Sequence, residues 1–500
     1  MKSLWLSTSS PPQHATLGGD LSAEVIVLGG GIAGLTTAYL LQRRGLKVAL
    51  LEARQIARGV TGNTTAKVTS NHTLTYRRLS QRHDLEIARK YGLANQAAVD
   101  LIRKLVKEND IECNLTDASA FTISRDEQHA DEIAKEIEVA GKIGLPARSA
   151  QVNELPFKVH AAMEFTGQFH FHPVKYLAGL CELFLAAGGR VFEHSPAVVV
   201  EHGATVTVQT AQGTARAKNV VVATHQPCSL DGWYFARMRQ KRSFAIALRL
   251  EGSVPRGMYI SVGGEFVTMR PTIENGSELL IFGGESHQPG QEPHTVQRLA
   301  QLEQRARKLF PVAEVRYRWA THDNVTGDGL PFIGQMRRQN RNVFVATGFA
   351  GWGMSNGTAS GMILADLVTG EANPHAEAFD PLRGQMQSRV SGLVRDMVVG
   401  SRALLGAFRS TDKPKSVEQL APGGGAIFSD GLDRIAVHRD DEGALHSVGA
   451  VCTHLQCIVR WNNAERTWDC PCHGSRFDVD GGVLHGPAVE PLARDEPPAE

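Results

Sequence analysis

Four cysteines and two histidines near the end of the chain have the spacing of a metal-binding site. The two groups read Cys452-Thr-His454-Leu-Gln-Cys457 and Cys470-Pro-Cys472-His473. Each group offers one thiolate and one imidazole, in the pattern C-x-H, fifteen residues, C-x-x-H. This ligand set suits a [2Fe–2S] centre with two cysteines on one iron and two histidines on the other. The alternative is a structural Cys₂His₂ zinc site, but such a site needs no further cysteines, and here each group keeps one more.

A second constellation, near the start of the chain, is typical of dinucleotide binding. Residues 23–52 have the pattern of strand, glycine turn, helix and strand, and they end in an acid. The turn has the form G-x-G-x-x-G, with Gly29, Gly31 and Gly34. The glycines allow the backbone to approach a pyrophosphate closely, and the helix N-terminus favours its negative charge. Glu52 is placed to accept a hydrogen bond from a ribose hydroxyl.

Composition limits the classes of protein that remain. The chain has 500 residues, of which 42% are hydrophobic and 21% charged, and its net charge is +1. This balance gives no reason to expect nucleic acid or an anionic membrane as a partner. No run approaches the roughly 18 consecutive apolar residues of a membrane-spanning helix, and the first twenty residues lack the apolar core of a secretory signal. We therefore expect a cytoplasmic protein of about two to four domains with no transmembrane segment.

The C-terminal region, about residues 416–494, resembles the Rieske domains of cytochrome bc-type complexes, whose loops read C-T-H-L-G-C and C-P-C-H-G-S. The resemblance implies that four residues bind a [2Fe–2S] cluster: Cys452, His454, Cys470 and His473. It also implies that Cys457 and Cys472 form a disulfide.

The chain departs from the Rieske pattern at two positions. Gln456 replaces the usual glycine, and Phe477 stands where the respiratory proteins tend to carry tyrosine. Ser475 can still donate to a cluster sulfur, but a second hydroxyl is absent. Because hydrogen bonds to sulfur raise the reduction potential, we expect a value below that of the respiratory proteins, within the broad span of roughly −150 to +300 mV.

The front of the chain, residues 23 to about 370, resembles the FAD-dependent D-amino-acid oxidase superfamily, which includes glycine and sarcosine oxidases and γ-glutamylputrescine oxidase. The resemblance rests on the N-terminal motif, the strand VVVATH (220–225) and the turn VATGFAGWGMSNGTASG (345–361). His225 stands where the family often has glycine.

The resemblance implies an FAD site. Its expected contacts are Gly29, Gly31, Gly34 and Glu52 at the ADP part, Val198 at the adenine, and Gly353 and Met354 at the flavin. Thr61 and Thr65 lie in a polar loop whose hydroxyls could contact the flavin or its phosphates. That loop, T-G-N-T-T-A, has no histidine of the kind that links FAD covalently in some relatives, so we expect noncovalent FAD.

The order of expected elements predicts the fold class: an α/β Rossmann-type FAD-binding domain with an inserted α+β substrate domain, followed by a small all-β Rieske domain. The expected boundaries are an N-terminal arm (1–22), an FAD-binding domain (23–75, 150–230 and 320–370), a substrate domain (76–149 and 231–319), a helical linker (371–415) and a Rieske domain (416–500). Within the linker, residues 386–398 have the apolar spacing of an amphipathic helix, which we interpret as packing across the domain junction.

These features favour a flavin enzyme that oxidises a C–N bond of an amine or amino acid by hydride transfer to FAD. The Rieske cluster would then pass electrons singly to an acceptor protein or quinone. No acid or base is strongly identified. Lys67, His72 and Trp352 lie near the expected flavin loops and are catalytic candidates, although packing or solvent exposure accounts for each equally well.

Two other classes of function fit the sequence less well. A non-catalytic electron-transfer protein or redox sensor would need no enclosed substrate cavity, so the expected second domain argues against it. A Rieske oxygenase would need an iron held by two histidines and a carboxylate, and the H-x-H of His170 and His172 has no clear partner for that role.

Overall fold

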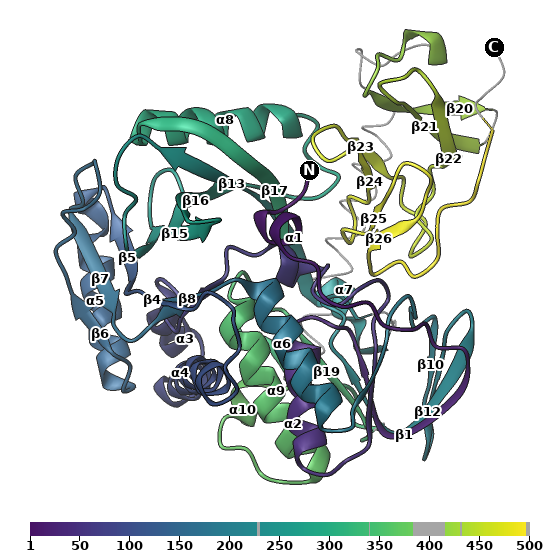
Figure 1. Ribbon diagram of the computed structural model, residues 1–500, viewed down its shortest axis with the longest axis horizontal. Coiled ribbons are helices and arrows are strands. Elements are labelled where there is room, and N and C mark those ends of the chain that lie inside the picture. Colours follow the sequence, from purple (N-terminus) through teal and green to yellow (C-terminus); the bar gives the residue numbers. More distant parts are fainter. Residues whose placement is uncertain (228–230, 340, 384–415, 431–432, 497–500) are drawn as a thin grey trace.

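The computed structural model describes residues 1–227, 231–339, 341–383, 416–430 and 433–496. Two large sheets and a small C-terminal β region make up this part of the chain (Figure 1). The expected amphipathic helix over 386–398 lies outside the described residues. No helix among those described has the length and apolar character that crossing a membrane requires.

The first sheet holds the glycine motif. Its strands follow the order β10-β11-β12-β1-β2-β9, and β19 extends it beside β12 and carries β18. The bounds are β1 Gly19–Leu28, β2 Val48–Leu51, β9 Arg190–Phe192, β10 Val199–Glu201, β11 Val206–Gln209, β12 Gly213–Val222, β18 Phe332–Gln335 and β19 Val343–Thr347. β1 runs parallel to both β2 and β12, so the turn after β1 opens at the carboxyl edge of a parallel sheet. Ligands bind at this edge in open α/β sheets.

Three helices cover one face of the first sheet: α2 (Ile32–Arg43), α6 (Pro173–Ala186) and α9 (Gly353–Thr369) (Figure 1). α2 and α9 approach closely because glycines line their contact. A Cβ atom at Gly357 would lie 2.7 Å from Ile32, and one at Gly361 would lie 2.6 Å from Thr36. The N-terminus of α9 is thereby held beside the glycine motif at the start of α2.

The second sheet is mostly antiparallel and has the order β17-β13-β16-β15-β14-β5-β7-β6. Its bounds are β5 Ala120–Ser124, β6 Ala147–Ser149, β7 Ala161–Phe165, β13 Met238–Leu250, β14 Met258–Ser261, β15 Thr268–Glu274, β16 Ser277–His287 and β17 Val312–Thr326. α8 (Thr295–Leu309) packs Leu302 and Ala306 onto Phe244 and Ile246 of β13. Burial of such apolar faces is the main source of stability for a layered domain.

Further helices and a small sheet complete the front part of the described chain. The helices are α3 (Thr75–Arg82), α4 (Leu85–Glu108), α5 (Ala130–Lys142), α7 (Tyr234–Arg237) and α10 (Ala376–Phe379), and a small sheet joins β3 (Lys67–Val68), β8 (Phe169–His170) and β4 (Thr116–Asp117). Asp84 caps α4 by accepting a hydrogen bond from the amide of Ile87 at 2.7 Å, as an N-cap carboxylate does.

The sheets divide the chain differently from the expected domain boundaries. β7 lies within the segment 150–230 that was assigned to the FAD-binding domain, but it pairs with β5 in the second sheet. β17 belongs to the second sheet and continues to Thr326, past the expected boundary at 320. Strand patterns in the sequence show that these segments are extended, but not which sheet they join.

The N-terminal arm packs onto the loop expected to contact the flavin. The arm contains α1 (Leu4–Thr8), and Leu4 and Trp5 are buried. Ser3 Oγ donates to the carbonyl of Gly62 at 2.5 Å, and Trp5 Nε1 donates to the carbonyl of Thr64 at 2.7 Å. The arm therefore supports the turn η1 (Val60–Asn63) and the residues that follow it.

The C-terminal region is built from two small antiparallel sheets. One joins β20 (Gly425–Asp430), β21 (Asp433–Arg439) and β22 (Leu445–Gly449), and the other joins β23 (Arg460–Asn462), β24 (Thr467–Asp469), β25 (Arg476–Phe477) and β26 (Val483–His485). Val448, Trp468 and Phe477 are in its core. This region lies beside β17 and α8 of the second sheet (Figure 1).

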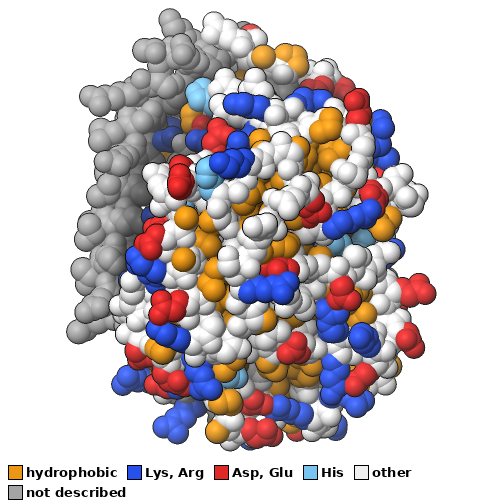
Figure 2. Space-filling view, turned by 90° about the vertical axis from the view of Figure 1, so that its left-hand side faces the viewer, with side chains coloured by type: hydrophobic (Ala, Val, Ile, Leu, Met, Phe, Trp, Pro, Cys, Tyr) orange, Lys and Arg blue, Asp and Glu red, His pale blue; other side chains and the backbone are white. Residues whose placement is uncertain are grey.

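The surface carries charges of both signs. On the face shown in Figure 2, Lys and Arg side chains are interspersed with Asp and Glu over the described residues. Ion pairs among the described residues include Arg256 with Glu278 and Lys142 with Glu138. The mixture agrees with the net charge of +1.

Candidate flavin and cluster site

One cavity of about 1240 Å³ brings together residues from both sheets and from the C-terminal region. It is bordered by the glycine turn, the 61–65 loop, the turn at 348–354, the second sheet around β13 and β17, and the C-terminal segment 482–491. The glycine turn, the 61–65 loop and the turn at 348–354, which were expected at the FAD, thus line the same space as the second sheet and a segment of the C-terminal region.

The glycine motif has the close packing that a dinucleotide turn needs. A Cβ atom at Gly29 would lie 2.5 Å from the carbonyl oxygen of Ala223, and one at Gly34 would lie 1.9 Å from the carbonyl oxygen of Gly29. Gly29 also has a φ of 108°, which favours glycine. Gly29 and Gly31 border the cavity, whereas Gly34 packs the helix against the strand. These are the separate roles that such glycines have in dinucleotide folds.

Glu52 lies at the end of β2 and borders the cavity. Its Oε2 accepts from the amide of Gly30 at 2.6 Å, and its Oε1 accepts from the amide of Arg54 at 2.9 Å. Burial raises the pKa of Glu52, although these two amides favour its charged form. The carboxylate is thereby fixed beside the glycine turn, where a ribose hydroxyl could donate to it.

Val198 differs from the other expected FAD contacts, because it does not border the cavity. Its amide donates to the carbonyl of Gln209 at 2.8 Å as part of a strand pair. Its neighbours Ser195, Pro196 and Ala197 border the cavity instead. The contact between Val198 and adenine therefore stays a prediction, in a segment whose preceding residues border the cavity.

The loops expected at the flavin are all at the cavity wall. Thr61, Thr65, Gly353 and Met354 border it. Thr61 Oγ1 accepts from the amide of Ile32 at 3.2 Å, which ties the loop to the first turn of α2. The segment T-G-N-T-T-A that spans this loop offers no histidine or cysteine for a covalent bond to FAD.

The structure separates the three catalytic candidates. Lys67 and Trp352 border the cavity, but His72 does not. His72 is buried beneath Trp352, with ring centroids 4.5 Å apart, and it contacts the hydroxyl of Tyr91 at 2.7 Å. Burial lowers the pKa of His72 to about 3, so the ring is neutral and supports Trp352. Lys67 donates to Thr268, and burial together with the charge of Arg270 lowers its pKa well below the ordinary value.

Asp323 is a cavity residue that sequence reasoning missed. It lies on β17, where Thr321, Asp323 and Val325 alternate along the cavity wall. Its carboxylate accepts a hydrogen bond from the amide of Gly351, in the turn before α9. Burial raises the pKa of Asp323 to about 6, although Lys241 on the paired strand β13 counteracts it. The signal in the sequence was a single acid in a strand that leads to a glycine-rich turn.

The two Cys/His loops meet as the cluster ligand set requires. Cys452 and Cys470 are buried free thiols that form a hydrogen bond with each other, and the rings of His454 and His473 are 5.0 Å apart. The hydrogen bond with Cys470 is the largest influence that lowers the pKa of Cys452 to about 7, against the effect of burial. The donor set of two thiols and two imidazoles therefore fits a [2Fe–2S] cluster.

Backbone amides converge on the two sulfur atoms. The amides of His454 and Leu455 donate to Cys452, and the amides of Cys472 and His473 donate to Cys470. The Ser475 hydroxyl also forms a hydrogen bond with Cys452. Donors around the sulfur ligands stabilise negative charge there and tune the potential of the metal centre.

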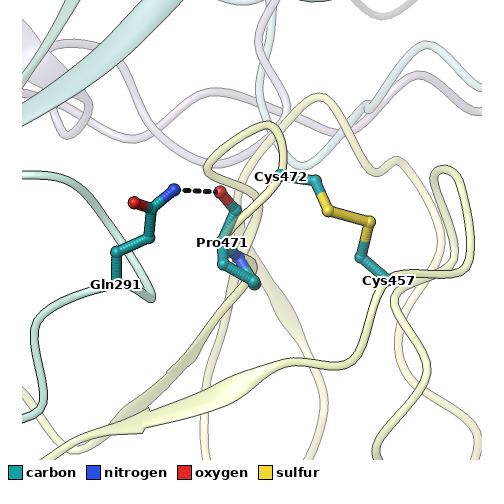
Figure 3. Close-up of a disulfide and its surroundings, with 4 residues drawn as sticks. All are labelled: Gln291, Cys457, Pro471 and Cys472. Atoms are coloured by element: carbon teal, nitrogen blue, oxygen red, sulfur yellow. Dashed lines mark hydrogen bonds between the residues drawn. A yellow bond between two sulfur atoms is a disulfide. The ribbon is translucent and has the colours of Figure 1, made fainter. Parts of the chain in front are cut away.

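A disulfide joins the two loops (Figure 3). Cys457 and Cys472 are bonded with an S–S distance of 2.01 Å, and this is the pair that the Rieske resemblance implies. Gln456 occupies the position of the usual glycine with a φ of 56°, in the left-handed region that favours glycine. Gln456 thus adopts a backbone conformation that costs a non-glycine residue free energy.

The cluster loops face the rest of the protein. The ring of Phe235 in α7 lies edge-on to the rings of both His454 and His473, at 5.1 and 5.0 Å between centroids. Gln291, beyond the end of β16, donates to the carbonyl of Pro471 at 3.1 Å (Figure 3). The histidine side of the expected cluster is thus covered by the flavin-binding part of the molecule.

Four buried charges join the second sheet to the C-terminal region. Arg242 on β13 binds Glu465 through Nη2 at 2.5 Å, and Arg476 binds both Glu465 at 3.0 Å and Asp469 at 2.9 Å. Although burial raises it, the charges of Arg242 and Arg476 hold the pKa of Glu465 at about 2. We call these four residues the interface quartet.

Comparison with known proteins agrees with both halves of the site. The family model described as "FAD dependent oxidoreductase" (DAO) matches residues 24–367, and the Rieske [2Fe-2S] domain model matches residues 414–495. The protein YhfW of Bacillus subtilis (strain 168), named as a Rieske 2Fe-2S iron-sulfur protein, is 35% identical over 491 residues, which are 98% of this chain and 96% of that protein.

Other relatives match the front of the chain. The γ-glutamylputrescine oxidoreductase of Escherichia coli (strain K12) is 24% identical over 392 residues, which are 73% of this chain and 87% of that enzyme. Glycine oxidase from Geobacillus kaustophilus has a TM-score of 0.59 at 19% identity and covers 72% of this chain and 97% of its own. At this identity the solved structure shows a shared fold. The two family models and the relative that matches over nearly its full length agree on what this chain is. The chain belongs to the FAD-dependent oxidoreductases of the DAO family and binds FAD in its front part, and its C-terminal Rieske domain binds a [2Fe–2S] cluster.

Proposed function

We propose that this oxidoreductase oxidises a C–N bond of an amine or amino acid and that the electrons leave through its Rieske domain. One observation carries the proposal. A single cavity contains the dinucleotide turn, a half-buried carboxylate beside the flavin-facing turn, and a segment of the Rieske domain. The relatives named as γ-glutamylputrescine oxidoreductase and glycine oxidase support an amine or amino acid as the substrate class.

The cofactors supply the electron chemistry. Bound FAD would accept a hydride from the carbon next to the substrate nitrogen, and the cluster would accept electrons one at a time. The chain's own residues must bind the substrate, remove its ammonium proton and exclude water. An amine is oxidised as the neutral base, so the site needs a proton acceptor close to the substrate nitrogen.

Asp323 is the group we assign to that role. Its pKa of about 6 means that it is ionised at neutral pH, so the carboxylate can pair with the substrate ammonium and accept its proton. The hydrogen bond from Gly351 fixes the carboxylate against the turn that precedes Gly353. Lys67 also borders the cavity, and its amine donates to Thr268, which suits it to orient the substrate. The oxidised product is an imine, which hydrolyses to a carbonyl compound and an amine or ammonia.

The covered histidine side of the Rieske loops supports an internal route for electrons. The ring of Phe235 in α7 lies against the rings of His454 and His473, and residues 482–491 border the flavin cavity. If the Rieske domain exchanged electrons only with external proteins and did so through its histidines, these histidines would have to be exposed. The acceptor beyond the cluster is a protein or a quinone.

The proposal is tested by mixing the protein with amines and N-methyl amino acids under anaerobic conditions. We expect at least one of them to bleach the flavin absorbance, whereas the matching alcohols, which lack the nitrogen, leave it unchanged. If no amine bleaches the flavin but a reduced electron-transfer protein does, the molecule is a shuttle and the proposal is wrong.

A further inference from the structure

Three histidines meet where the two sheets and the Rieske domain come together. His225 follows β12 of the first sheet, His322 lies on β17 of the second, and His485 ends β26 of the Rieske domain. Their ring centroids are 5.7 Å apart for His225 and His322, 5.2 Å for His225 and His485, and 4.2 Å for His322 and His485. One ring nitrogen from each lies within 4.8 Å of the other two. We call this group the histidine triad.

The triad nitrogens lack protein partners. The Nε2 atoms of His225, His322 and His485 are buried, and none forms a hydrogen bond with the described residues. A buried polar atom without a partner is costly, so three such atoms on rings that lie together favour a ligand between the rings.

The backbone at His225 supports the same conclusion. His225 has a φ of 65°, in the left-handed region that costs a non-glycine residue free energy. Its carbonyl is held by Asn324 Nδ2 at 2.9 Å and by the hydroxyl of Thr347. Strained residues of this kind are retained where their side chains have a function.

The charges around the triad permit a cation. Burial lowers the pKa of all three histidines, to about 4 for His225, and neighbouring His and Arg side chains lower those of His322 and His485 further. The rings are therefore neutral, which is the form that binds metals. Arg242, Arg476 and Arg54 lie nearby, but Glu465 and Asp469 pair with the first two and Glu52 opposes the charge of Arg54.

We propose that His225, His322 and His485 bind one divalent first-row transition metal ion at the junction of the three parts of the molecule. Imidazole suits Zn²⁺, Cu²⁺, Ni²⁺ and Fe²⁺, and three protein ligands leave at least one coordination position for water or another ligand. His225 and His485 border the flavin cavity, so that open position is on the cavity side.

Metal binding carries one local cost. Arg242 Nη1 is 3.5 Å from Nδ1 of His322, at the outer limit of a hydrogen bond. A metal on Nε2 places the ring proton on Nδ1, so this long contact must open. Arg242 keeps its two bonds to Glu465 through Nε and Nη2, and it therefore stays in place.

The ion would fasten the Rieske domain to the flavin-binding part. His322 packs against the cluster loop, since a Cβ atom at Gly474 would lie 3.2 Å from its ring. His485 comes from the same domain as the cluster, and His225 comes from the wall of the dinucleotide cavity. A metal ion bound by all three histidines would connect the two cofactor sites rigidly.

The test is metal analysis of the full-length holoprotein. The protein is dialysed against a chelator, titrated with Zn²⁺ and freed of excess ion, and its zinc and iron are measured per chain. We expect one tightly bound zinc with two irons in the wild type. In His485→Gln and His322→Asn we expect zinc to fall at least tenfold while iron stays at two. X-ray absorption at the zinc edge should show imidazole scattering.

His287→Asn is the matched control. His287 is also a buried histidine whose Nε2 has no hydrogen-bond partner among the described residues, but it is not part of the triad. It should keep its zinc. Two results would overturn the proposal: a wild type that holds two irons and no zinc, or triad variants that bind zinc as well as the wild type. Bound FAD and the EPR signal of the cluster show that each variant is folded, so a loss of zinc cannot come from unfolding.

Discussion

At the scale of single residues, the account rests most heavily on Asp323. The carboxylate must be ionised to accept the substrate proton, and its pKa is about 6 because it is buried. We therefore expect kcat/KM to fall with slope one as the pH drops below about 6. Asp323→Asn should lower kcat/KM by about 10² to 10⁴-fold, the usual contribution of a general base, and should remove this acidic limb.

Thr321→Val is the control for Asp323. Thr321 lies on the same strand and borders the same cavity, but it does not titrate in this range. Its pH profile should match that of the wild type. An Asp323→Asn enzyme that keeps the acidic limb would show that another group accepts the proton.

A second residue, Ser475, is expected to raise the reduction potential of the cluster. Its hydroxyl forms a hydrogen bond with Cys452 and accepts the amide of Ala488 at 3.0 Å, which holds it in place. A donor to sulfur favours the reduced, more negative cluster. Losing about 1 to 2 kcal/mol of this preference in Ser475→Ala corresponds to about 40 to 90 mV, because 59 mV is a factor of ten for one electron.

The potential of the Ser475→Ala cluster is measured by an EPR-monitored redox titration. We expect a lower midpoint potential than in the wild type, with two irons retained. Ser447→Ala, which removes an exposed hydroxyl bonded to the carbonyl of Asp495 in the same domain, should leave the potential unchanged. A potential that does not move in Ser475→Ala would mean that the hydroxyl does not stabilise the reduced state.

At the scale of elements, the N-terminal arm supports the flavin loop. Trp5 is 1% exposed and its indole N–H donates to Thr64, two residues before the end of the 61–66 loop. Trp5→Ala should cost about 3 to 5 kcal/mol of stability and weaken FAD retention, because the cavity left behind lies under this loop. Trp5→Phe keeps most of the volume and should cost about 1 to 3 kcal/mol through the unpaired carbonyl of Thr64.

For the Trp5 variants, urea unfolding measures the stability, and the temperature at which flavin fluorescence appears measures the retention of FAD. Trp233→Ala is the control, since Trp233 is 38% exposed and lies away from this loop. We expect it to retain FAD like the wild type. If an arm variant lost stability but kept its FAD, the arm would not be needed for FAD binding.

Local elements could be predicted well from the sequence. The strand, turn and helix of the glycine motif were expected over 23–52, and the structure has β1, α2 and β2 there. Local patterns suffice for such a unit, because glycine spacing and apolar runs determine it within thirty residues. The pairing of β7 and the length of β17 could not be predicted, since strand partners distant in the chain decide them.

At the scale of the whole molecule, the interface quartet holds the Rieske domain against the flavin-binding part. Arg242 is 4% exposed in its side chain and Glu465 is 12% exposed. Removing one partner of a buried pair leaves an uncompensated charge and costs about 3 to 5 kcal/mol. Arg242→Ala should therefore undock the Rieske domain and slow the reduction of the cluster by substrate, with little change in the reduction of FAD.

Arg249→Ala is the control for the quartet. Arg249 lies on the same strand, and its partner Glu314 is on the second sheet itself, with both side chains about half exposed. Stopped-flow absorbance of the flavin and freeze-quench EPR of the cluster should both match the wild type in this variant. Equal cluster reduction in Arg242→Ala would mean that the docked arrangement is not needed for electron transfer.

As with the fold, the parts of the candidate site that depend on short motifs could be predicted, and the parts that depend on distant segments could not. The cluster ligands and the glycine turn were found from the sequence because each set is confined to a short motif. Asp323 and the histidine triad were not, because their meaning depends on neighbours from other parts of the chain. His72 was a candidate by position in the sequence, but packing places it beneath Trp352 rather than in the cavity.

The most direct test of the central claim is a single anaerobic turnover followed in two ways. An amine that bleaches the flavin is mixed with oxidised holoprotein, and the flavin absorbance and the EPR signal of the reduced Rieske cluster are recorded over the same interval. The account expects the cluster signal to grow as the flavin is reduced, at the same rate at any protein concentration, because the transfer is intramolecular. A bleached flavin beside a cluster that stays oxidised would contradict it.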